Sequence, residues 1–119
     1  MTVRVYISTV ADKTMFIPED RSNQVVADNR KTFLEQHDIV MAHATRVNIT
    51  YDRENFCEYR EVNLEQDGGL GMTLDDSNPA DALITKDSGH ALFLPLADCV
   101  GAVLFDPAQH ILMVTHLGR

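Results

Sequence analysis

The sequence has no apolar run that approaches the roughly 20 residues needed to cross a membrane as a helix. It also has no continuous apolar core near its start, where polar and apolar residues alternate from Met1 to Ser8. The first absence excludes a helical membrane span, and the second argues against a secretory signal peptide. We therefore expect a cytoplasmic protein with no membrane partner.

Basic residues are scarce. The chain has ten Lys and Arg residues and 18 Asp and Glu residues, which gives a formal net charge of −8 at pH 7. Nucleic-acid binding needs clustered Lys and Arg, and the basic residues of this chain are scattered, so we expect no nucleic-acid partner. A small anionic substrate is compatible with this balance, because a single Arg can dominate the potential inside a site.

Cysteine is equally scarce. The two cysteines, Cys57 and Cys99, could form one disulfide, but a lone pair without a secretory signal is more simply interpreted as two thiols. Cys57 lies in an alternating stretch with charged neighbours, which is typical of a structural residue. Cys99 is then the thiol that remains for metal binding or for reaction.

What is present is the composition of a globular protein. The chain has 119 residues, 45% of them apolar, and we interpret residues 1–119 as a single domain, truncated relative to a complete fold. Alternation predicts a strand over Thr2 to Val10, and a cap at Ser22 predicts a helix to about Gln36. Residues 11–20 and 65–79 are predicted to be loops, and the second of these is rich in glycine and acidic residues. Short apolar or alternating stretches predict six more strands, at residues 39–42, 45–51, 57–64, 91–96, 100–105 and 111–115.

These elements predict an α/β fold with a mixed β-sheet layered with helix. The predicted helix has one buried stripe, made by Val26, Arg30, Phe33 and Leu34. A single helix cannot cover both faces of about seven strands, so one sheet face should be poorly covered. The last strand ends in Thr115-His116, and the three residues after it, Leu117 to Arg119, supply no further strand. We therefore expect a longer chain, a homodimer partner or another complementary chain to complete the domain.

Three residues with metal-binding side chains stand at the ends of apolar stretches: His43, Cys99 and His116. If the last two strands form a hairpin through Asp106 to Gln109, Cys99 and His116 lie nearly opposite each other across the ladder. Two imidazoles and a thiolate form a three-ligand zinc set that leaves the fourth position for water or substrate. Each residue alone also fits a structural role, Cys99 as a small buried side chain and the histidines as hydrogen-bonded strand-end residues.

The other three histidines are predicted to have no such role. His90 follows Gly89 in an apparent turn and His110 follows Pro107 in another, so we expect both imidazoles to be solvated. His37 falls at the end of the predicted helix, where its charge suits the helix dipole.

Five islands of sequence occur in a fixed order. They are Ala-Asp-Ala-Leu-Ile-Thr at residues 80–85, Gly89, Ala-Asp-Cys at 97–99, Asp-Pro at 106–107 and His-Leu-Gly-Arg at 116–119. In this order and at these separations they resemble the first-half signature of the multicopper polyphenol oxidase family, also called laccase-domain proteins or peptidoglycan-editing factors. Upstream, Asn29-Arg30 resembles the family's Asn-Arg, and Met41 to Val47 resembles its Gln-Val-His-Gly-Thr-x-Val. The resemblance covers about residues 20–119.

This resemblance implies a laccase-domain fold, a cytotoxic necrotizing factor-like α-β sandwich of which this chain contains the first half. It implies phosphorolysis of purine nucleosides such as adenosine, inosine and methylthioadenosine, with adenosine deamination as a side activity. The family's metal trio falls on His43, Cys99 and His116, which are thereby also the expected catalytic residues. Zinc is the usual metal and copper that of the oxidase description, and this ligand type suits both.

Arg30 and Arg119 are candidates for binding the phosphate co-substrate, because a guanidinium fork fits phosphate oxygens. The chain departs from the family pattern at its last island, where the family has His-Ala-Gly-Trp-Arg-Gly. Arg119 matches the family Arg only if one residue is deleted.

Other functions also fit the residues. Cys99 could act as a bare nucleophile with His116 as its base, in a metal-free hydrolase or transferase. Alternatively, the chain is a non-catalytic half-module that pairs with another chain through an open edge strand. Oxidation of phenols by several coppers is disfavoured, because five histidines with three convergent cannot build that centre.

Overall fold

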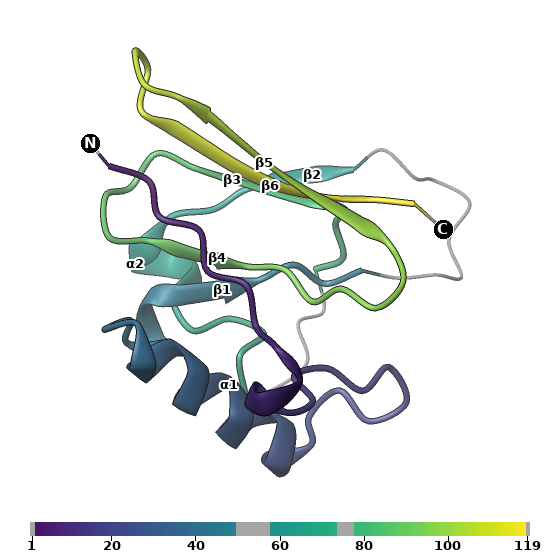
Figure 1. Cartoon of the computed structure of the whole chain (residues 1–119). Helices are drawn as coiled ribbons and strands as arrows, with labels where there is room; N and C mark the ends of the chain where they lie inside the picture. Colours follow the sequence, from purple (N-terminus) through teal and green to yellow (C-terminus); the bar gives the residue numbers. More distant parts are fainter. Residues whose placement is uncertain (1, 50–57, 74–77, 119) are drawn as a thin grey trace.

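The computed structural model describes residues 2–49, 58–73 and 78–118, and every structural statement below concerns these residues. Two α-helices and six strands are regular elements of the described chain (Figure 1). In chain order they are α1 Gln24–Gln36, β1 Ala44–Arg46, β2 Tyr59–Glu61, α2 Leu64–Asp67, β3 Ala82–Thr85, β4 Ala91–Phe93, β5 Val100–Asp106 and β6 Ile111–Leu117. Two 3-10 helices, Val10–Asp12 and Met41–His43, precede α1 and β1.

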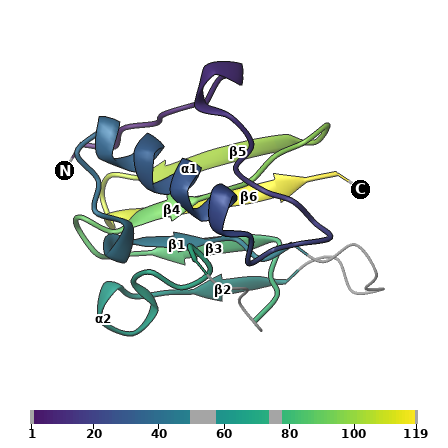
Figure 2. The same cartoon turned by 90° about the horizontal axis from the view of Figure 1, so that it is seen from below.

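These elements stack in three layers. Helix α1 covers one side of the two-stranded sheet β1–β4, and the four-stranded sheet β2–β3–β6–β5 lies on the other side (Figures 1 and 2). Strands β1 and β4 run parallel, as do β2 and β3, whereas β6 is antiparallel to both β3 and β5. The predicted mixed α/β fold is therefore confirmed.

Two apolar clusters hold the layers together. Between α1 and the two-stranded sheet, the buried side chains are Phe33, Leu34, Ala44 and Met72. Between the two sheets they are Val47, Ile49, Val62, Leu83 and Val114, with Leu92 and Leu94 packed against them. Burial of these side chains is the main favourable term for folding, at about 25 cal/mol per Å² of apolar surface.

Helix α1 follows the sequence closely. Its cap is Asn23, one residue after the predicted Ser22, and the Asn23 side-chain oxygen accepts hydrogen bonds from the backbone N–H groups of Val25 and Val26. This cap satisfies donors that the first helical turn leaves unpaired. The predicted stripe of Val26, Arg30, Phe33 and Leu34 is buried. Arg30 is therefore buried rather than solvated.

Two predicted strands are wrong. The segment predicted as a strand over Thr2 to Val10 forms no strand, and Ile7 is 84% exposed. Its alternation suits a strand, but a strand also needs a partner with which to pair, and within the described residues this segment pairs with no strand. Residues 39–42 enter the 3-10 helix Met41–His43 instead, after the chain turns at Asp38, whose φ is 58°.

The glycine-rich stretch is partly structured. Residues 65–79 were predicted to be a loop, but α2 occupies Leu64–Asp67, and Met72 is fully buried beneath α1. Gly68 has no room for a side chain, because an added Cβ would lie 2.5 Å from the Ala42 carbonyl oxygen. Residues 74–77 and Cys57 lie outside the described residues.

Within the described ranges, no layer of helix or strand covers the face of the four-stranded sheet that points away from β1 and β4, as the ratio of one helix to many strands predicted. The clusters that fill the core lie on the other face of that sheet, toward β1 and β4. Strand β3, which was not predicted as a strand, is central to this sheet and pairs with both β2 and β6. None of the helices in the described ranges is long and apolar enough to cross a membrane.

Candidate functional site

The β5–β6 hairpin carries Cys99 and His116, and its register differs by two residues from the sequence prediction. The observed ladder pairs Asp106 with Ile111 and Gly101 with His116. The turn spans residues 107–110, one residue later than predicted, because the Asp106 carboxylate accepts hydrogen bonds from the N–H groups of Ala108 and Gln109. Cys99 therefore lies level with Gly118 and diagonally from His116.

Cys99 and His116 nevertheless share one face of the ladder. A Cβ placed on Gly118 would lie 3.5 Å from both the Cβ and the Sγ of Cys99, so the Cys99 side chain points to the same face as position 118. His116, two residues earlier on β6, points to that face as well, because strand side chains alternate. Diagonal neighbours on one face are about 7–8 Å apart at Cα, which is within reach of one small ligand.

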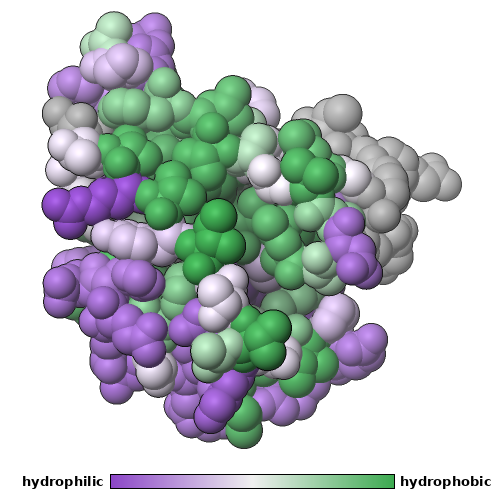
Figure 3. Space-filling model, in the orientation of Figure 1, coloured by the Kyte–Doolittle hydropathy of each residue, from purple (hydrophilic) through white to green (hydrophobic). Residues whose placement is uncertain are grey.

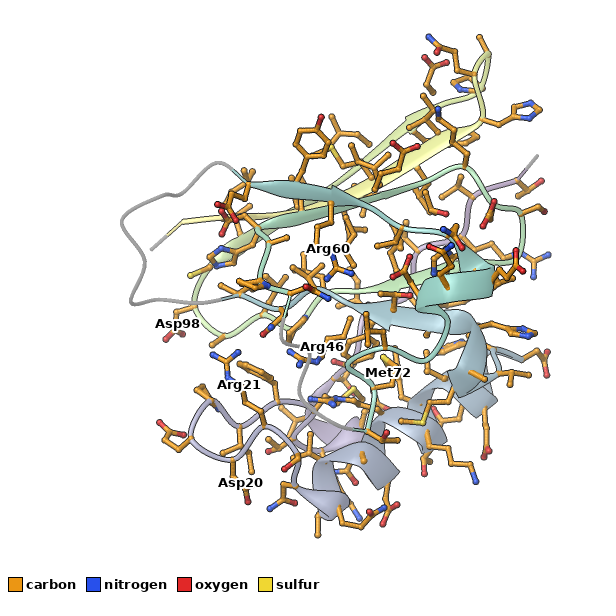
Figure 4. The ribbon with its side chains drawn as sticks, turned by 180° about the vertical axis from the view of Figure 1, so that it is seen from behind. Asp20, Arg21, Arg46, Arg60, Met72 and Asp98 are labelled. Carbon is orange, nitrogen blue, oxygen red and sulfur yellow. The ribbon has the colours of Figure 1, made fainter. Side chains whose placement is uncertain are left out.

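This pair is sheltered on its inner side. His116 is 7% exposed, and its backbone N–H donates to the Asp81 carbonyl at 2.8 Å. Gly101, the cross-strand partner of His116, has no side chain, and methyl groups of Leu94 and Leu96 fill the space beside it. Cys99 is half-buried, whereas Asp98 is exposed and lies at the periphery (Figure 4). The arrangement is a partly desolvated thiol and imidazole at the rim of the sheet.

His43 lies elsewhere. It ends the 3-10 helix before β1, and the residue that follows it, Ala44, pairs with Ala91 at the start of β4. His43 is therefore a neighbour of His90, which contacts Thr85 at the last position of β3.

His116 and the neighbouring residues His43 and His90 lie near opposite ends of β3. His116 bonds to Asp81, just before β3 begins, and His90 bonds to Thr85, where β3 ends. Four residues of extended strand span about 13 Å, so the backbone positions beside which His116 and His90 lie are well separated. Across residues 2–49, 58–73 and 78–118, no three His, Cys, Asp or Glu side chains gather around a common metal position.

The donor types of the predicted trio thus suit zinc, but the position of His43 does not complete the site. Cys99 and His116 supply a thiolate and an imidazole on one face, which is two of the three protein ligands that a catalytic zinc uses. The metal trio stays a prediction from the sequence, and the description of the chemistry below uses no step through a metal.

His90 is a buried residue that the sequence reasoning missed. Its Nε2 lies 2.8 Å from the Thr45 hydroxyl oxygen and its Nδ1 lies 2.9 Å from that of Thr85. The prediction of a solvated imidazole is wrong, although the turn at Gly89 is present, with a φ of 80°. A turn signal locates the backbone, but it does not say which way the next side chain points.

The hydroxyl partners determine the tautomer of His90. Thr45 donates its proton to the Asp67 carbonyl at 2.7 Å, so its oxygen must accept from a protonated Nε2. Thr85 accepts from the Asp87 N–H at 3.2 Å, and its hydroxyl proton points to Nδ1. This chain of hydrogen bonds links β1, β3, β4 and α2 through a neutral imidazole.

We expect this imidazole to make stability depend on pH. Burial lowers the pKa of His90 below 6.5, as does His43, while Asp87 and Asp67 oppose the shift. Because the folded pKa is lowered, the stabilisation is present above about pH 6.5 and is lost as pH falls from there toward the folded value. Denaturant unfolding from pH 7.5 to pH 5 should show stability falling by at most about 1.4 kcal/mol per pH unit from this group.

A His90→Gln variant should remove that part of the pH dependence. His110→Gln is the matched control, because His110 lies exposed in the β5–β6 turn and should leave the slope as in the wild type. Equal slopes in wild type and His90→Gln would contradict the prediction.

A scan against protein families gives the first relation to known proteins. The model of the family described as multi-copper polyphenol oxidoreductase laccase matches residues 15–119. The chain belongs to this family. The resemblance inferred from the five sequence islands is therefore confirmed, and the family is one of enzymes whose description refers to copper.

Two solved structures resemble this laccase-family chain. The hypothetical protein YfiH of Bacillus licheniformis has 23% identity and a TM-score of 0.71, over 80% of this chain and 34% of that one. YlmD from Geobacillus stearothermophilus has 23% identity and a TM-score of 0.66, over 83% of this chain and 35% of that one. The chain thus spans about a third of the length of these structures. No curated protein matches it.

In this laccase-family chain, the predicted phosphate-binding Arg30 is committed to the fold. Its Nε donates to the Met15 carbonyl at 2.7 Å, and its Nη1 donates to the carbonyls of Gly71 and Met72 at 3.2 and 2.9 Å. Burial, and then Arg46, lower the pKa of Arg30 to about 10, so the guanidinium stays charged at neutral pH. Its phosphate-binding role stays a prediction, and Arg119 lies outside the described residues.

A second guanidinium lies beside Arg30. Arg46 is also fully buried, and its Nε donates to the same Gly71 carbonyl at 2.6 Å. Figure 4 shows Arg46 and Met72 in the region between α1 and the sheets. Sequence reasoning did not single out Arg46, because a charged residue in an alternating stretch predicts an exposed position.

A groove of about 1070 Å³ lies on the His43 side of the molecule. The N-terminal segment forms one wall, and apolar side chains of the sheets, including Leu92, Leu94 and Val114, form the other. His43 lines this groove, and Cys99 and His116 do not. The sequence-predicted site residues are therefore divided between two regions of the described structure.

Proposed function

We propose that this laccase-family chain is a purine nucleoside phosphorylase whose chemistry centres on Cys99 and His116. The observation that supports it is the placement of a half-buried thiol and a buried imidazole on one face of the β5–β6 ladder. Family membership supports the enzyme class, and the nucleoside substrate comes from the resemblance of the sequence motifs. Zinc and a deaminase side activity belong to the same proposal.

The reaction requires one proton movement that the pair can serve. A phosphate oxygen forms a bond to C1′ of the ribose, and the bond from C1′ to the base nitrogen breaks with its electron pair on the base. The departing base then takes a proton, and His116 is the group placed to give it. Cys99, beside it, is the second acid–base group of the pair, and methyl groups of Leu94 and Leu96 lie beside Gly101, the cross-strand partner of His116.

A second candidate function is favoured because, among the described residues, no third metal-ligating side chain joins Cys99 and His116. Without a third ligand nearby, Cys99 is the nucleophile and His116 its base, in a metal-free hydrolase or transferase. The Cys99 sulfur then forms a bond to an electrophilic carbon of the substrate while His116 takes the thiol proton, and the bond from that carbon to the leaving group breaks with its electron pair on the leaving group, which takes the proton from His116. Water or an acceptor group, giving its proton to His116, then displaces the Cys99 sulfur and releases the product.

Phosphate dependence tests the first function. Purified chain is incubated with adenosine, inosine or methylthioadenosine, with and without inorganic phosphate, and base and ribose 1-phosphate are measured. We expect release of base that requires phosphate and is matched by equal ribose 1-phosphate. Release of base without phosphate, or no release at all, would overturn the proposed phosphorolysis.

Metal content separates the two candidate functions. About one zinc per chain, lost on His43→Ala, Cys99→Ala and His116→Ala alike, would establish the trio. In that case alkylation of Cys99 should be slow until a chelator is added, because a metal-bound thiolate is protected. Rapid alkylation of metal-free protein would favour the bare cysteine.

A further inference from the structure

The groove on the His43 side of the molecule lies between two lengths of extended backbone. Strand β4 pairs with β1 along one edge, and within the described residues its other edge pairs with no strand. Residues 2–8 line the same groove and belong to no strand. Figure 2 shows this N-terminal segment on the side of β4 that is away from β1. The groove therefore occupies the place where the next strand of the β1–β4 sheet would lie.

Backbone groups of β4 point toward this place. The Phe93 carbonyl accepts a hydrogen bond from the Val47 N–H at 2.8 Å, so Phe93 directs its backbone groups to the side of β1. Successive residues of a strand direct these groups to opposite edges, so the N–H and C=O of Leu92 point away from β1. No described residue hydrogen-bonds either of these groups of Leu92. They are a donor and an acceptor for an added strand.

The N-terminal segment has backbone groups to offer from the other side. Tyr6 stacks on His37 after the end of α1, with ring centroids 3.9 Å apart. No backbone–backbone hydrogen bond joins residues 2–8 to another described segment. The alternation of this segment is typical of a strand, and a strand inserted beside it would supply the pairing partner that it lacks.

Apolar layers cover the groove on both faces. Side chains of β4 pack alternately against the cluster beneath α1 and the cluster between the two sheets. The groove continues both layers, because its lining includes Phe33 and Leu34 of α1 and Val103 and Val114 of the four-stranded sheet. Figure 3 shows hydrophobic residues gathered on the face where the N-terminal segment, β4 and β5 lie in Figure 1. A strand in the groove would be buried on both faces and would therefore be apolar throughout.

The charged side chains around the groove differ in balance from those of the whole chain. Acidic residues outnumber Lys and Arg by 18 to 10 in the sequence. The groove is lined instead by three Lys or Arg and two Asp, namely Arg4, Lys13, Lys86, Asp38 and Asp87. This balance favours an occupant that carries carboxylates beside its apolar residues.

We infer that the groove binds an extended peptide segment as a strand between β4 and residues 2–8. Its core is a run of about five apolar residues, which is the usual length of a strand, and acidic residues flank that run. Main-chain hydrogen bonds to the two edges provide affinity, and the apolar layers on both faces provide specificity. This inference does not depend on the proposed function, because neither Cys99 nor His116 lines the groove.

Fluorescence anisotropy with a labelled synthetic peptide tests the inference. The probe is Glu-Glu-Val-Ile-Val-Leu-Val-Glu-Glu with blocked ends, and we expect saturable binding to the purified chain at micromolar concentration. The matched control carries N-methyl groups on alternate apolar residues, which removes the N–H donors along one edge and keeps every side chain. It should bind at least about tenfold more weakly, because backbone groups lose their partners. A probe flanked by Lys in place of Glu should also bind more weakly.

Variants of the chain locate the binding. Val103→Asn places a polar amide in the apolar lining and should weaken binding of the probe at least about tenfold. Leu104→Asn is the matched control. Leu104 is the next residue of β5, is 52% exposed, and points to the opposite face of the sheet, away from the groove lining. It should leave the affinity unchanged.

Circular dichroism of each variant verifies that it is folded, and the methylated peptide provides a test without any change in the protein should Val103→Asn fail to fold. Absence of binding by the wild-type chain would overturn the inference. Equal binding of the methylated peptide would overturn it too, because the groove would then hold an apolar ligand without strand pairing. A dimer that Val103→Asn dissociates would assign the groove to a second copy of the chain and would also contradict the inference.

Discussion

Replacing Cys99 with alanine is expected to lower kcat/KM for phosphate-dependent nucleoside cleavage at least about a hundredfold, because a positioned acid–base group contributes 10² to 10⁴ in rate. The substitution removes the sulfur atom beside His116 and leaves the β5–β6 ladder intact. Steady-state kinetics on inosine at saturating phosphate would measure the loss, with thermal unfolding to verify that the variant is folded.

Two further variants sharpen this result. Asp98→Ala is the control, since Asp98 is the exposed neighbour of Cys99 and should change the rate little. His116→Ala should lose activity to a similar extent, and the double variant should lose little more, because residues that act as a unit are not additive. Wild-type activity in Cys99→Ala would contradict the proposed role of the pair.

The second large effect is expected at Arg30. Arg30→Ala should lower the free energy of unfolding by about 3–5 kcal/mol, because three carbonyl groups lose a buried charged donor and a cavity remains. The guanidinium also lies 5.9 Å from the centre of the Phe93 ring, so one contact between α1 and β4 is lost with it. Since domains are stable by about 5–15 kcal/mol, the variant should be near the limit of folding. Urea unfolding monitored by circular dichroism measures this change.

Lys31→Ala is the matched control for Arg30. Lys31 is the next residue, and its exposed side chain contacts Glu35 at 3.6 Å on the surface of α1. Its loss should cost less than about 0.5 kcal/mol. An Arg30→Lys variant with wild-type stability and a raised KM for phosphate would contradict the structural role and support the sequence prediction of phosphate binding.

The β5–β6 hairpin shows which structural features can be predicted from local sequence. Short apolar stretches on either side of Asp106-Pro107 predicted two paired strands with Cys99 and His116 at their ends, and the family's metal trio fell on the same residues. The two-residue difference in register came from the Asp106 side chain, whose two hydrogen bonds to the turn place the turn one residue later. Several turns are compatible with one sequence, and the strands that flank the turn select among them.

Helix α1 and its buried stripe were predictable for a similar reason, because periodicity reports which face is buried. Periodicity does not indicate which segments of the chain contact the buried face of the helix. Arg30 was placed on the buried face, yet its three carbonyl acceptors come from segments 15 and 41 to 42 residues away in the sequence. No spacing rule connects these segments before the chain folds.

The sequence by itself determined the fold class, the family, the helix, the hairpin and the excess of strands over helical cover, because these depend on composition, local periodicity and ordered motifs. Tertiary structure alone decided that His90 is buried between two threonine hydroxyls, that the N-terminal segment forms no strand, and that His43 lies at the far end of β3 from His116. Each of these depends on which distant segments meet, and contacts of that kind follow from how the sheets pair and stack.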